Sequence, residues 1–283
     1  MKRLLLLLGI SAMCWLHPVL AVAQADTPMG ARAAALGNAS VTLPDVWAMH
    51  NNAAGIASLT QPEAGVYIEN RFGIQAFTTV ALQAVYPTGK YGSYGISLSR
   101  FGDALYSQQS VGLGAAHKLG QFSLGAKAEV WQVAIAGYGS RKAVALSVGG
   151  QGEIIPKLHF GAYAFNINQA RLAAFEDERL ATVMKAGLSY RPYQRLLLAM
   201  ETEKSIDHDA TFKAGVEYLV LQEKLALRTG FSTFTGSATF GLGFQARQLQ
   251  VGYAFGATTR LGSSHHLSVS YRYAARSPLA VRP

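Results

Sequence analysis

The chain has little charge, a single cysteine, and no long hydrophobic run after its first 25 residues. Only 14% of its 283 residues are charged, roughly half of the ~25% usual in soluble domains. Hydrophobic residues make up 50% of the chain, too large a share for it to stay disordered in water. A spanning helix needs about 20 consecutive apolar residues, and residues 26–283 contain no such run. Low charge together with 29 glycines and 13 tyrosines favours a large all-β protein embedded in a membrane.

The first 25 residues have the pattern of a cleaved export signal. A basic start (Lys2 and Arg3) precedes an apolar stretch at residues 4–16, and Ala23-Gln24-Ala25 matches the small-x-small pattern that signal peptidase reads. We expect cleavage after Ala25, with cleavage after Ala23 as the alternative, and delivery to the outer membrane. The only cysteine, Cys14, lies in this signal. A mature chain without cysteine excludes disulfides, thiolate catalysis and Cys-ligated metals.

The positive charge does not indicate a nucleic-acid partner. Without Lys2 and Arg3, 25 − 2 = 23 basic residues face 16 acidic ones, a net charge of +7. The basic residues are scattered singly, with no run that would track a phosphate backbone. Outer-membrane lipid is the first partner that the composition indicates.

From residue 64 to residue 273 the chain alternates between apolar and small or polar residues, as strands do. In residues 238–247, for example, Phe240, Leu242 and Phe244 alternate with Gly241 and Gly243. The pattern predicts fourteen strands, an even number as in single-chain bacterial barrels. Their expected ranges are 64–72, 75–87, 90–101, 104–118, 121–135, 141–155, 157–168, 179–191, 194–204, 210–221, 223–233, 236–247, 248–258 and 264–273.

The residues on the less apolar face of these strands favour a barrel over a soluble sandwich. They are largely Gly, Ser, Ala and Gln, which suit a barrel lumen better than a water-exposed sheet. Aromatic residues fall near strand ends, as in the girdles at membrane interfaces. We therefore predict an all-β protein, a 14-stranded antiparallel transmembrane β-barrel (residues 64–273) with an N-terminal plug segment and a tail (274–283). Arginine at outward-facing Phe240 should impair folding, whereas Gly241→Ser in the lumen should be mild.

Residues 26–63 lack strand alternation and are rich in Ala, Gly and Asn, which is unlike a free, solvated arm. The lumen of a fourteen-stranded barrel is too wide for its own side chains to fill. We therefore expect this segment to lie inside the barrel as a plug, the alternative being a periplasmic arm. The plug-motif residues are Gly30, Arg32, Gly37, Asn38, Asp45, Asn51, Asn52 and Gly55.

Within this segment, glycine permits close approach of backbones, and Asp or Asn can cap short helical turns. Asp45 and Asn51 are the candidate caps for turns at 46–50 and 53–58. A buried Arg32 should meet a luminal carboxylate. The candidate partners of Arg32 are Glu129, Glu153, Glu201 and Glu217.

Two stretches of this segment carry a family resemblance. Residues 30–41 (GARAAALGNASV) and 45–57 (DVWAMHNNAAGIA) resemble the N-terminal signature of PorV/PorQ proteins and, more distantly, of FadL-type outer-membrane transporters. The last strand, SHHLSVSYRY at 264–273, looks like the closing strand of the same proteins, which have fourteen strands. The chain departs from the pattern at Ala53, where the family usually has proline.

The resemblance implies two alternative functions. A PorV/PorQ-type protein would be a non-enzymatic component of type IX protein secretion, with translocon subunits or the signal domains of secreted proteins as partners. A FadL-like protein would be a passive channel for hydrophobic small molecules, with an apolar pocket and a lateral opening where a strand kinks at Gly92 and Gly95 or at Gly149-Gly150. The Gly-Ala-Arg start favours the secretion reading. The sequence contains no GxSxG, HExxH or P-loop motif, and we expect no enzyme activity, cofactor or metal.

Overall fold

The computed structural model describes residues 26–172, 179–206, 209–233, 236–258 and 261–273. The expected signal peptide (1–25) and the C-terminal tail (274–283) lie outside the described residues.

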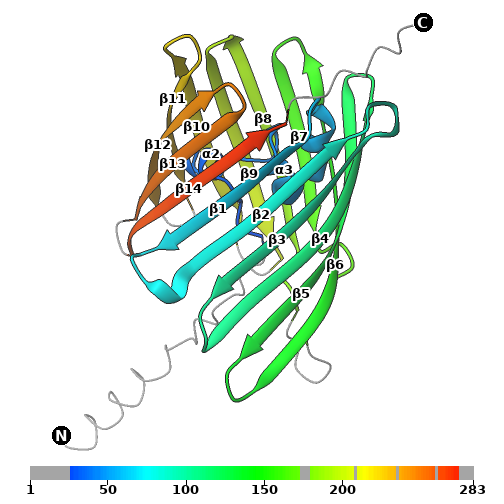
Figure 1. Cartoon of the computed structure of the whole chain (residues 1–283), viewed down its shortest axis with the longest axis vertical. Coiled ribbons are helices and arrows are strands. Elements are labelled where there is room, and N and C mark those ends of the chain that lie inside the picture. The colour runs from blue at the N-terminus through cyan, green and yellow to red at the C-terminus, as the bar shows by residue number, and fades with distance from the viewer. Residues whose placement is uncertain (1–25, 173–178, 207–208, 234–235, 259–260, 274–283) are drawn as a thin grey trace, which may run out of the picture.

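Fourteen antiparallel strands close into a barrel in which each strand pairs with its neighbours along the chain (Figure 1). The barrel closes where β1 pairs with β14, from Glu63 opposite Arg272 to Arg71 opposite Ser264. The predicted fold class and strand count are confirmed. The strands are β1 (Glu63–Arg71), β2 (Thr78–Pro87), β3 (Ser93–Gly102), β4 (Tyr106–Leu119), β5 (Phe122–Ile135), β6 (Gly139–Ile155), β7 (Leu158–Phe165), β8 (Val183–Tyr193), β9 (Leu196–Ser205), β10 (Thr211–Val220), β11 (Leu225–Ser232), β12 (Ser237–Ala246), β13 (Leu249–Thr258) and β14 (Gly262–Arg272).

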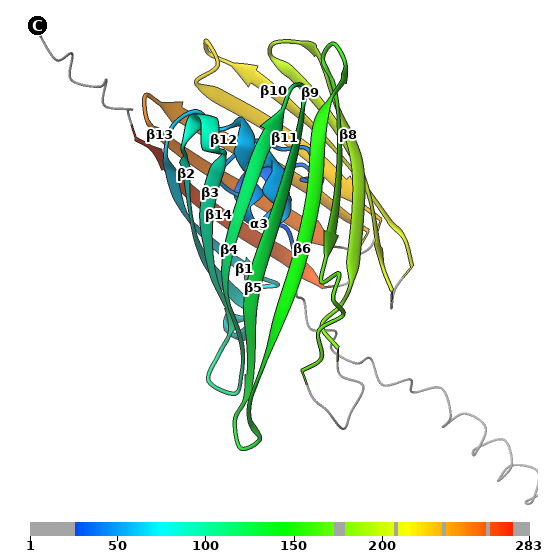
Figure 2. The same cartoon turned by 90° about the vertical axis from the view of Figure 1, so that its right-hand side faces the viewer.

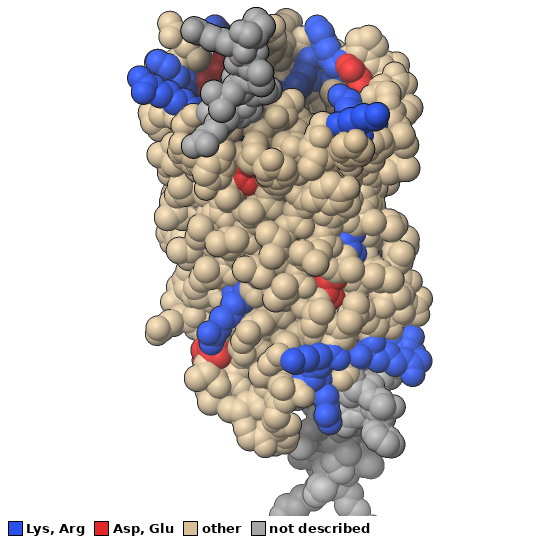
Figure 3. Space-filling view, turned by 45° about the vertical axis from the view of Figure 1, so that its right-hand side comes forward, with Lys and Arg blue, Asp and Glu red and all other residues tan. Residues whose placement is uncertain are grey.

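The alternation of the sequence becomes an apolar outside and a mixed inside. In β12, Phe240 and Leu242 are exposed on the outer surface, whereas Thr239 is buried in the lumen. On the face drawn in Figure 3, Lys and Arg gather toward the two ends, and the belt between them is mostly uncharged. Among the described residues, no helix is long and apolar enough to cross a membrane.

The two ends of the barrel differ in their connections. At one end, which we call the turn end, residues 120–121, 156–157, 194–195 and 247–248 form two-residue turns, and β1 begins and β14 ends there. At the other end, the loop end, β7 and β8 are joined by the longest connection, and β4, β5 and β6 project beyond the other strands (Figures 1 and 2). Short turns at the end that holds the strand termini are typical of the periplasmic side of such barrels.

Residues 26–62, here called the N-terminal segment, lie inside the barrel (Figure 2). The segment contains α2 (Ala31–Ala35), α3 (Ala48–Asn51) and the 3₁₀ turn η1 (Ala53–Ser58). Helix α2 packs against β11 to β14, and η1 packs against β2 to β6. The segment starts near the loop end, beside β8, and leaves at the turn end, where β1 begins.

The barrel wall has continuous ladders at the glycines expected to kink. The β2–β3, β3–β4 and β5–β6 ladders pass through Gly95 and Gly149-Gly150 without a register shift. The register shifts lie elsewhere, between Glu153 and Ile155 and between Tyr190 and Tyr193, both next to the turn end. The structure therefore shows no opening of the wall at Gly95 or at Gly149-Gly150, and Gly92 lies in the turn before β3, with a φ of 92°.

Candidate functional site: the occupied lumen

Glycines of neighbouring strands face each other in pairs around the lumen. Because glycine has no Cβ, such a pair lets another chain approach the sheet backbone closely. Four such pairs are Gly95 with Gly114, Gly125 with Gly149, Gly161 with Gly187, and Gly215 with Gly230. A fifth pair, Gly243 with Gly252, faces Arg228 of the wall and Ala31 of the segment.

Each of the first four pairs contacts a different part of the N-terminal segment. A methyl group at Gly114 would lie 2.7 Å from Cε of Met49, and one at Gly215 would lie 2.6 Å from the carbonyl oxygen of Leu36. The contact at Gly215 is with backbone, which cannot move aside, so the packing of Leu36 there depends on glycine, whereas Cε of Met49 is the end of a flexible side chain. The remaining pairs follow the same rule, with the backbone of Ala53 and Ala54 at Gly125, Asn52 at Gly149, and Val41 at Gly161 and Gly187.

Gly241 of β12 corrects one expectation from the sequence. A methyl group there would lie closer than 3.0 Å to Cβ of Ala35 in α2. Gly241→Ser is therefore not a mild luminal substitution, because the lumen at this point is filled by the segment.

The glycines of the segment itself allow its turns. Gly30 has a φ of 97°, and a side chain there would meet the ring of Trp47 at 2.6 Å. Gly37 and Asn38 both have a φ of 67°, and they end α2 with a left-handed turn. A methyl group at Gly55 would lie 2.7 Å from Cβ of Ala48, which keeps η1 close to α3.

The two asparagines have different roles from those expected. Asn52, not Asn51, is the cap of η1, and its Oδ1 accepts from the backbone N–H of Ala54 at 3.3 Å. Asn51 instead binds both backbone groups of Met29: its Oδ1 accepts from the N–H at 2.8 Å and its Nδ2 donates to the carbonyl at 2.9 Å. Asp45 accepts from the N–H of Trp47 at 3.1 Å, so it fixes the entry to α3. The side chains thus tie distant parts of the segment together.

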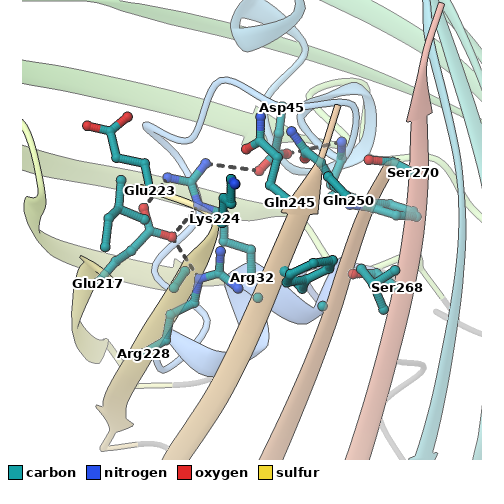
Figure 4. Close-up of a pocket in the computed structure, with 18 of the residues that line it drawn as sticks. Arg32, Asp45, Glu217, Glu223, Lys224, Arg228, Gln245, Gln250, Ser268 and Ser270 are labelled. Atoms are coloured by element: carbon teal, nitrogen blue, oxygen red, sulfur yellow. Dashed lines mark hydrogen bonds and ion pairs between the residues drawn. The ribbon is translucent and has the colours of Figure 1, made fainter. Parts of the chain in front are cut away.

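Arg32 of α2 makes the ionic contact that the sequence predicts, and Glu217 is its partner among the four candidates (Figure 4). Its Nε and Nη2 donate to the two carboxylate oxygens of Glu217 at 2.9 and 2.7 Å. Arg228 of β11 donates to the same carboxylate at 2.7 Å, and Asp45 lies 3.5 Å from Nη1 of Arg32. Two cations and two carboxylates thus join the segment to β10 and β11.

In this ionic group, burial and ion pairing shift the pKa of each side chain in opposite directions. Burial tends to lower the pKa of Arg32, but the carboxylates of Glu217 and Asp45 outweigh it and raise that pKa. Burial also raises the pKa of Asp45, and Arg32 only partly compensates. Arg32 therefore stays charged, and Asp45 depends on it as a partner.

A vestibule of about 680 Å³ opens at the turn end beside this ionic group. Its size falls in the range of small-molecule sites, roughly 300–1,000 Å³. Charged and polar side chains are the majority of its lining residues, with apolar ones such as Phe244 and Val251 between them. The N-terminal segment closes its inner side through Arg32, Asp45 and Trp47. The other residues drawn and labelled in Figure 4 are Glu217, Glu223, Lys224, Arg228, Gln245, Gln250, Ser268 and Ser270.

A second ionic cluster, here called the buried cluster, lies toward the loop end. Three lysines meet four carboxylates there, all of them on β5, β8, β9 and β10 except Asp26 of the segment. Glu201 also accepts from the backbone N–H groups of Ser40 and Val41 at 2.7 and 2.8 Å. The ion pairs are Lys127–Glu129 (2.9 Å), Lys185–Asp26 (2.6 Å), Lys185–Glu203 (3.7 Å), Lys213–Glu201 (3.0 Å) and Lys213–Glu203 (2.6 Å).

Between the vestibule and the loop end, buried aromatic rings lie in the lumen among buried polar and ionic side chains. Trp47 of the segment packs near Tyr67 of β1, with ring centroids 5.8 Å apart, and Trp131 packs near Phe165 at 6.0 Å. All four side chains are buried. A hollow here, lined in part by Tyr67 and Trp131, measures only about 30 Å³, so the segment fills the space.

The sequence analysis does not predict the roles of Lys185, Lys213 and Arg228, which form many of the ion pairs in the lumen. Their signal was nevertheless present, because each occupies the less apolar phase of its strand, where a charge must face the lumen. The pairing could not be read without the register of neighbouring strands. No group of three His, Cys, Asp or Glu residues in the described part of the chain could hold a metal ion.

No protein-family model matches the chain, and no curated protein sequence matches it. Solved structures do resemble it in fold. The monoaromatic hydrocarbon channel CymD superposes with a TM-score of 0.66 at 11% identity, covering 89% of this chain and 99% of that one. The Pseudomonas putida toluene transporter TodX superposes with a TM-score of 0.63 at 12% identity, covering 89% of this chain and 100% of that one. A Pseudomonas aeruginosa FadL homologue gives 0.61 at 12% identity, with 89% and 99% covered. Identities this low show a shared fold alone.

Proposed function

We propose that this protein is an outer-membrane channel for small hydrophobic molecules, closed at rest by its N-terminal segment. The observation that carries the proposal is a set of buried aromatic side chains in the lumen, where Trp47 of the segment and Tyr67, Trp131, Tyr163 and Phe165 of the wall belong to apolar clusters. A channel for polar solutes has a water-filled, polar interior, whereas this part of the lumen is filled by the segment and leaves a hollow of only about 30 Å³. The solved structures of similar fold include channels for monoaromatic hydrocarbons and a toluene transporter, which supports the same class of solute.

Passage requires the segment to move, because it fills the lumen between the loop end and the vestibule. A hydrophobic solute that displaces part of it replaces one set of apolar contacts with another, so the exchange costs little hydrophobic free energy. The charged vestibule at the turn end then offers a hydrated exit. The segment thus acts as a plug in this proposal.

The secretion function, with PorV/PorQ-type partners, receives no support from the solved structures of similar fold, which include hydrocarbon channels and a FadL homologue. The short connections at the loop end also leave little surface for a large partner. The continuous ladders of β2 to β4 offer no lateral opening in the closed state, so the proposal routes the solute through the lumen.

A reversible tether between segment and wall tests the proposal. A Cβ at Gly252 would lie 3.3 Å from Cβ of Ala31, near the ~3.5–4.5 Å that a disulfide needs. The double variant Ala31→Cys/Gly252→Cys would hold α2 against β13 when oxidised and release it when reduced. The predicted mature chain has no other cysteine, so the tether is the one disulfide formed.

Uptake of radiolabelled toluene is measured in Gram-negative cells with and without the protein, because hydrocarbons cross simple phospholipid bilayers unaided. We expect the natural chain to increase uptake, the oxidised variant to lose that increase, and reduction to restore it. The single variants Ala31→Cys and Gly252→Cys control for the substitutions themselves. Uptake that never exceeds that of cells without the protein would overturn the channel proposal. If the oxidised variant took up as much toluene as the natural chain, the proposal that the segment moves would be wrong.

A further inference from the structure

The buried cluster is one positive charge short. Its four carboxylates are Asp26, Glu129, Glu201 and Glu203, and its three cations are Lys127, Lys185 and Lys213. Six of these seven side chains are at most 5% exposed, and Glu203 is the one with more contact with water, at 25%. His50 lies near the cluster, but burial and the charges of Lys127 and Lys185 lower its pKa well below the ordinary value, so it supplies no cation. A net negative charge in such a place is costly unless a cation compensates it.

Asp26 is the residue where the missing charge is needed. Its Oδ2 lies 2.6 Å from Nζ of Lys185, and its backbone carbonyl accepts from the same Nζ at 3.1 Å. Its Oδ1, although buried, has no hydrogen-bond partner among the described residues. Burial raises the pKa of Asp26 to about 6 even though Lys185 opposes it, which agrees with an incompletely compensated carboxylate.

The backbone at this point is fixed. The carbonyl of Asp26 is held by Lys185, and the carbonyl of Thr27 accepts from Nε2 of His50 at 3.1 Å. The α-nitrogen of Asp26 is bonded to the same Cα as the carbonyl and the side chain that Lys185 holds, which places it beside the cluster. As an amide it is neutral, whereas as a free amine it carries one positive charge at neutral pH.

We propose that signal cleavage falls between Ala25 and Asp26, and that the α-ammonium group released there is the fourth cation of the buried cluster. Hydrolysis breaks the C–N bond between these residues. Water supplies the hydroxyl oxygen to the carbonyl carbon of Ala25, which leaves as a carboxylate, and its protons convert the nitrogen of Asp26 into an ammonium. Processing thus changes the cluster from three cations against four carboxylates to four against four. The N-terminal segment is seated fully only in the processed chain.

This inference rests on the fold and not on the channel proposal, and its first test is chemical. Intact-mass and N-terminal sequence analysis of the protein purified from the outer membrane should give a chain that begins at Asp26. Reaction with an amine-acylating reagent at pH 8 should then modify this α-amine at least ~10-fold more slowly in the folded protein than in the unfolded one, since each unit of pKa shift changes the free-amine fraction tenfold. Exposed Lys90 should react equally in both states. A different first residue, or an α-amine as reactive in the folded state as in the unfolded one, would overturn the proposal.

A charge-swap cycle tests the role of the ammonium in the cluster. Insertion of Thr-Gln between Ala25 and Asp26 keeps Asp26 but moves the α-ammonium two residues away, and intact mass verifies where this chain is cleaved. Glu203→Gln should lower the thermal unfolding midpoint of the natural chain, because it leaves four cations facing three carboxylates. In the extended chain Glu203→Gln should raise the midpoint, because three lysines then face three carboxylates. A shift of the same sign in both backgrounds would show that the α-ammonium is not part of the cluster.

Discussion

Arg32 of α2 and Glu217 of β10 are joined through both carboxylate oxygens, with N–O distances of 2.9 and 2.7 Å. They are 185 residues apart in sequence, so this pair ties the N-terminal segment to the far wall of the barrel. Such two-point pairing of guanidinium and carboxylate is strong and directional. It fixes the rotation of α2 and thereby the position of Asp45, which lies on the other side of Arg32.

Removal of Arg32 should therefore loosen the segment. In Arg32→Met, Glu217 keeps Arg228, but Asp45 loses the cation to which it is paired. We expect a loss of about 3 kcal/mol in the free energy of unfolding, the lower end for a broken buried pair, because Arg32 retains some contact with water. Urea unfolding in detergent measures the change. Adding Asp45→Asn removes the orphaned carboxylate and should recover part of the loss, and a double variant less stable than Arg32→Met would contradict this account.

Because the N-terminal segment packs directly against luminal glycines, a single added methyl group should loosen it strongly. In Gly125→Ala the new Cβ would run into the backbone of Ala53 and Ala54, which cannot rotate away. We expect the segment to lose its protection from added protease and the thermal midpoint to fall. Gly256→Ala is the matched control, since its Cβ would find its nearest neighbour at 3.7 Å, in ordinary contact. Equal behaviour of the two variants would mean that the segment is not seated on the glycines.

The outer face can be tested at Phe240, which is 56% exposed on β12. Arginine at the midplane of a lipid-facing strand costs about 2–4 kcal/mol, so Phe240→Arg should fold poorly into lipid bilayers. Cold SDS gel mobility before and after heating reports the folded fraction. Gly256→Ser is the luminal control, in place of Gly241→Ser, because a side chain at Gly241 would meet Ala35. If Phe240→Arg folds as well as the control, the assignment of the two faces is wrong.

His50 should make the stability of the folded protein depend on pH. It is buried, its Nε2 contacts the carbonyl of Thr27, and burial is the main cause of its lowered pKa. The unfolded chain takes up a proton near pH 6.5 and the folded chain does not, so this group costs stability as the pH falls below about 6.5, by up to ~1.4 kcal/mol per pH unit. His50→Gln keeps a donor for Thr27 without the titration. The stability difference between the natural chain and His50→Gln should change in this direction between pH 7 and pH 5, and a constant difference would refute the assignment.

Much of the barrel could be predicted because alternation is a local property of the sequence. All fourteen predicted strands are present, and the largest boundary errors lie around the connection between β7 and β8. There the sequence pattern starts a strand at residue 179, whereas β8 begins at Val183. Leu180, which lies between these two positions, is buried in the apolar cluster that contains Trp131 and Phe165, so its apolar character reflects packing of the connection.

The lumen could be predicted less well, because its contacts join residues that are distant in sequence. From the sequence alone Gly95 and Gly149 suggest kinks, since a glycine weakens a strand. In the structure Gly95 faces Met49 of the segment and Gly149 faces Asn52. Which of four carboxylates meets Arg32 depends on the height of α2 in the barrel. Likewise, a cap at Asn51 and one at Asn52 are indistinguishable until the path of the chain between Val41 and Ala54 is known.

The most direct test of a lumen closed by the N-terminal segment is single-channel conductance in planar bilayers of the natural chain and of a variant lacking residues 30–58. The barrel should survive the deletion, because Glu217 keeps Arg228 and Glu201 keeps Lys213, and circular dichroism should show nearly unchanged β-content. The account predicts a clear rise in conductance for the deletion variant over the natural chain. A folded deletion variant that conducts no better than the natural chain would contradict it.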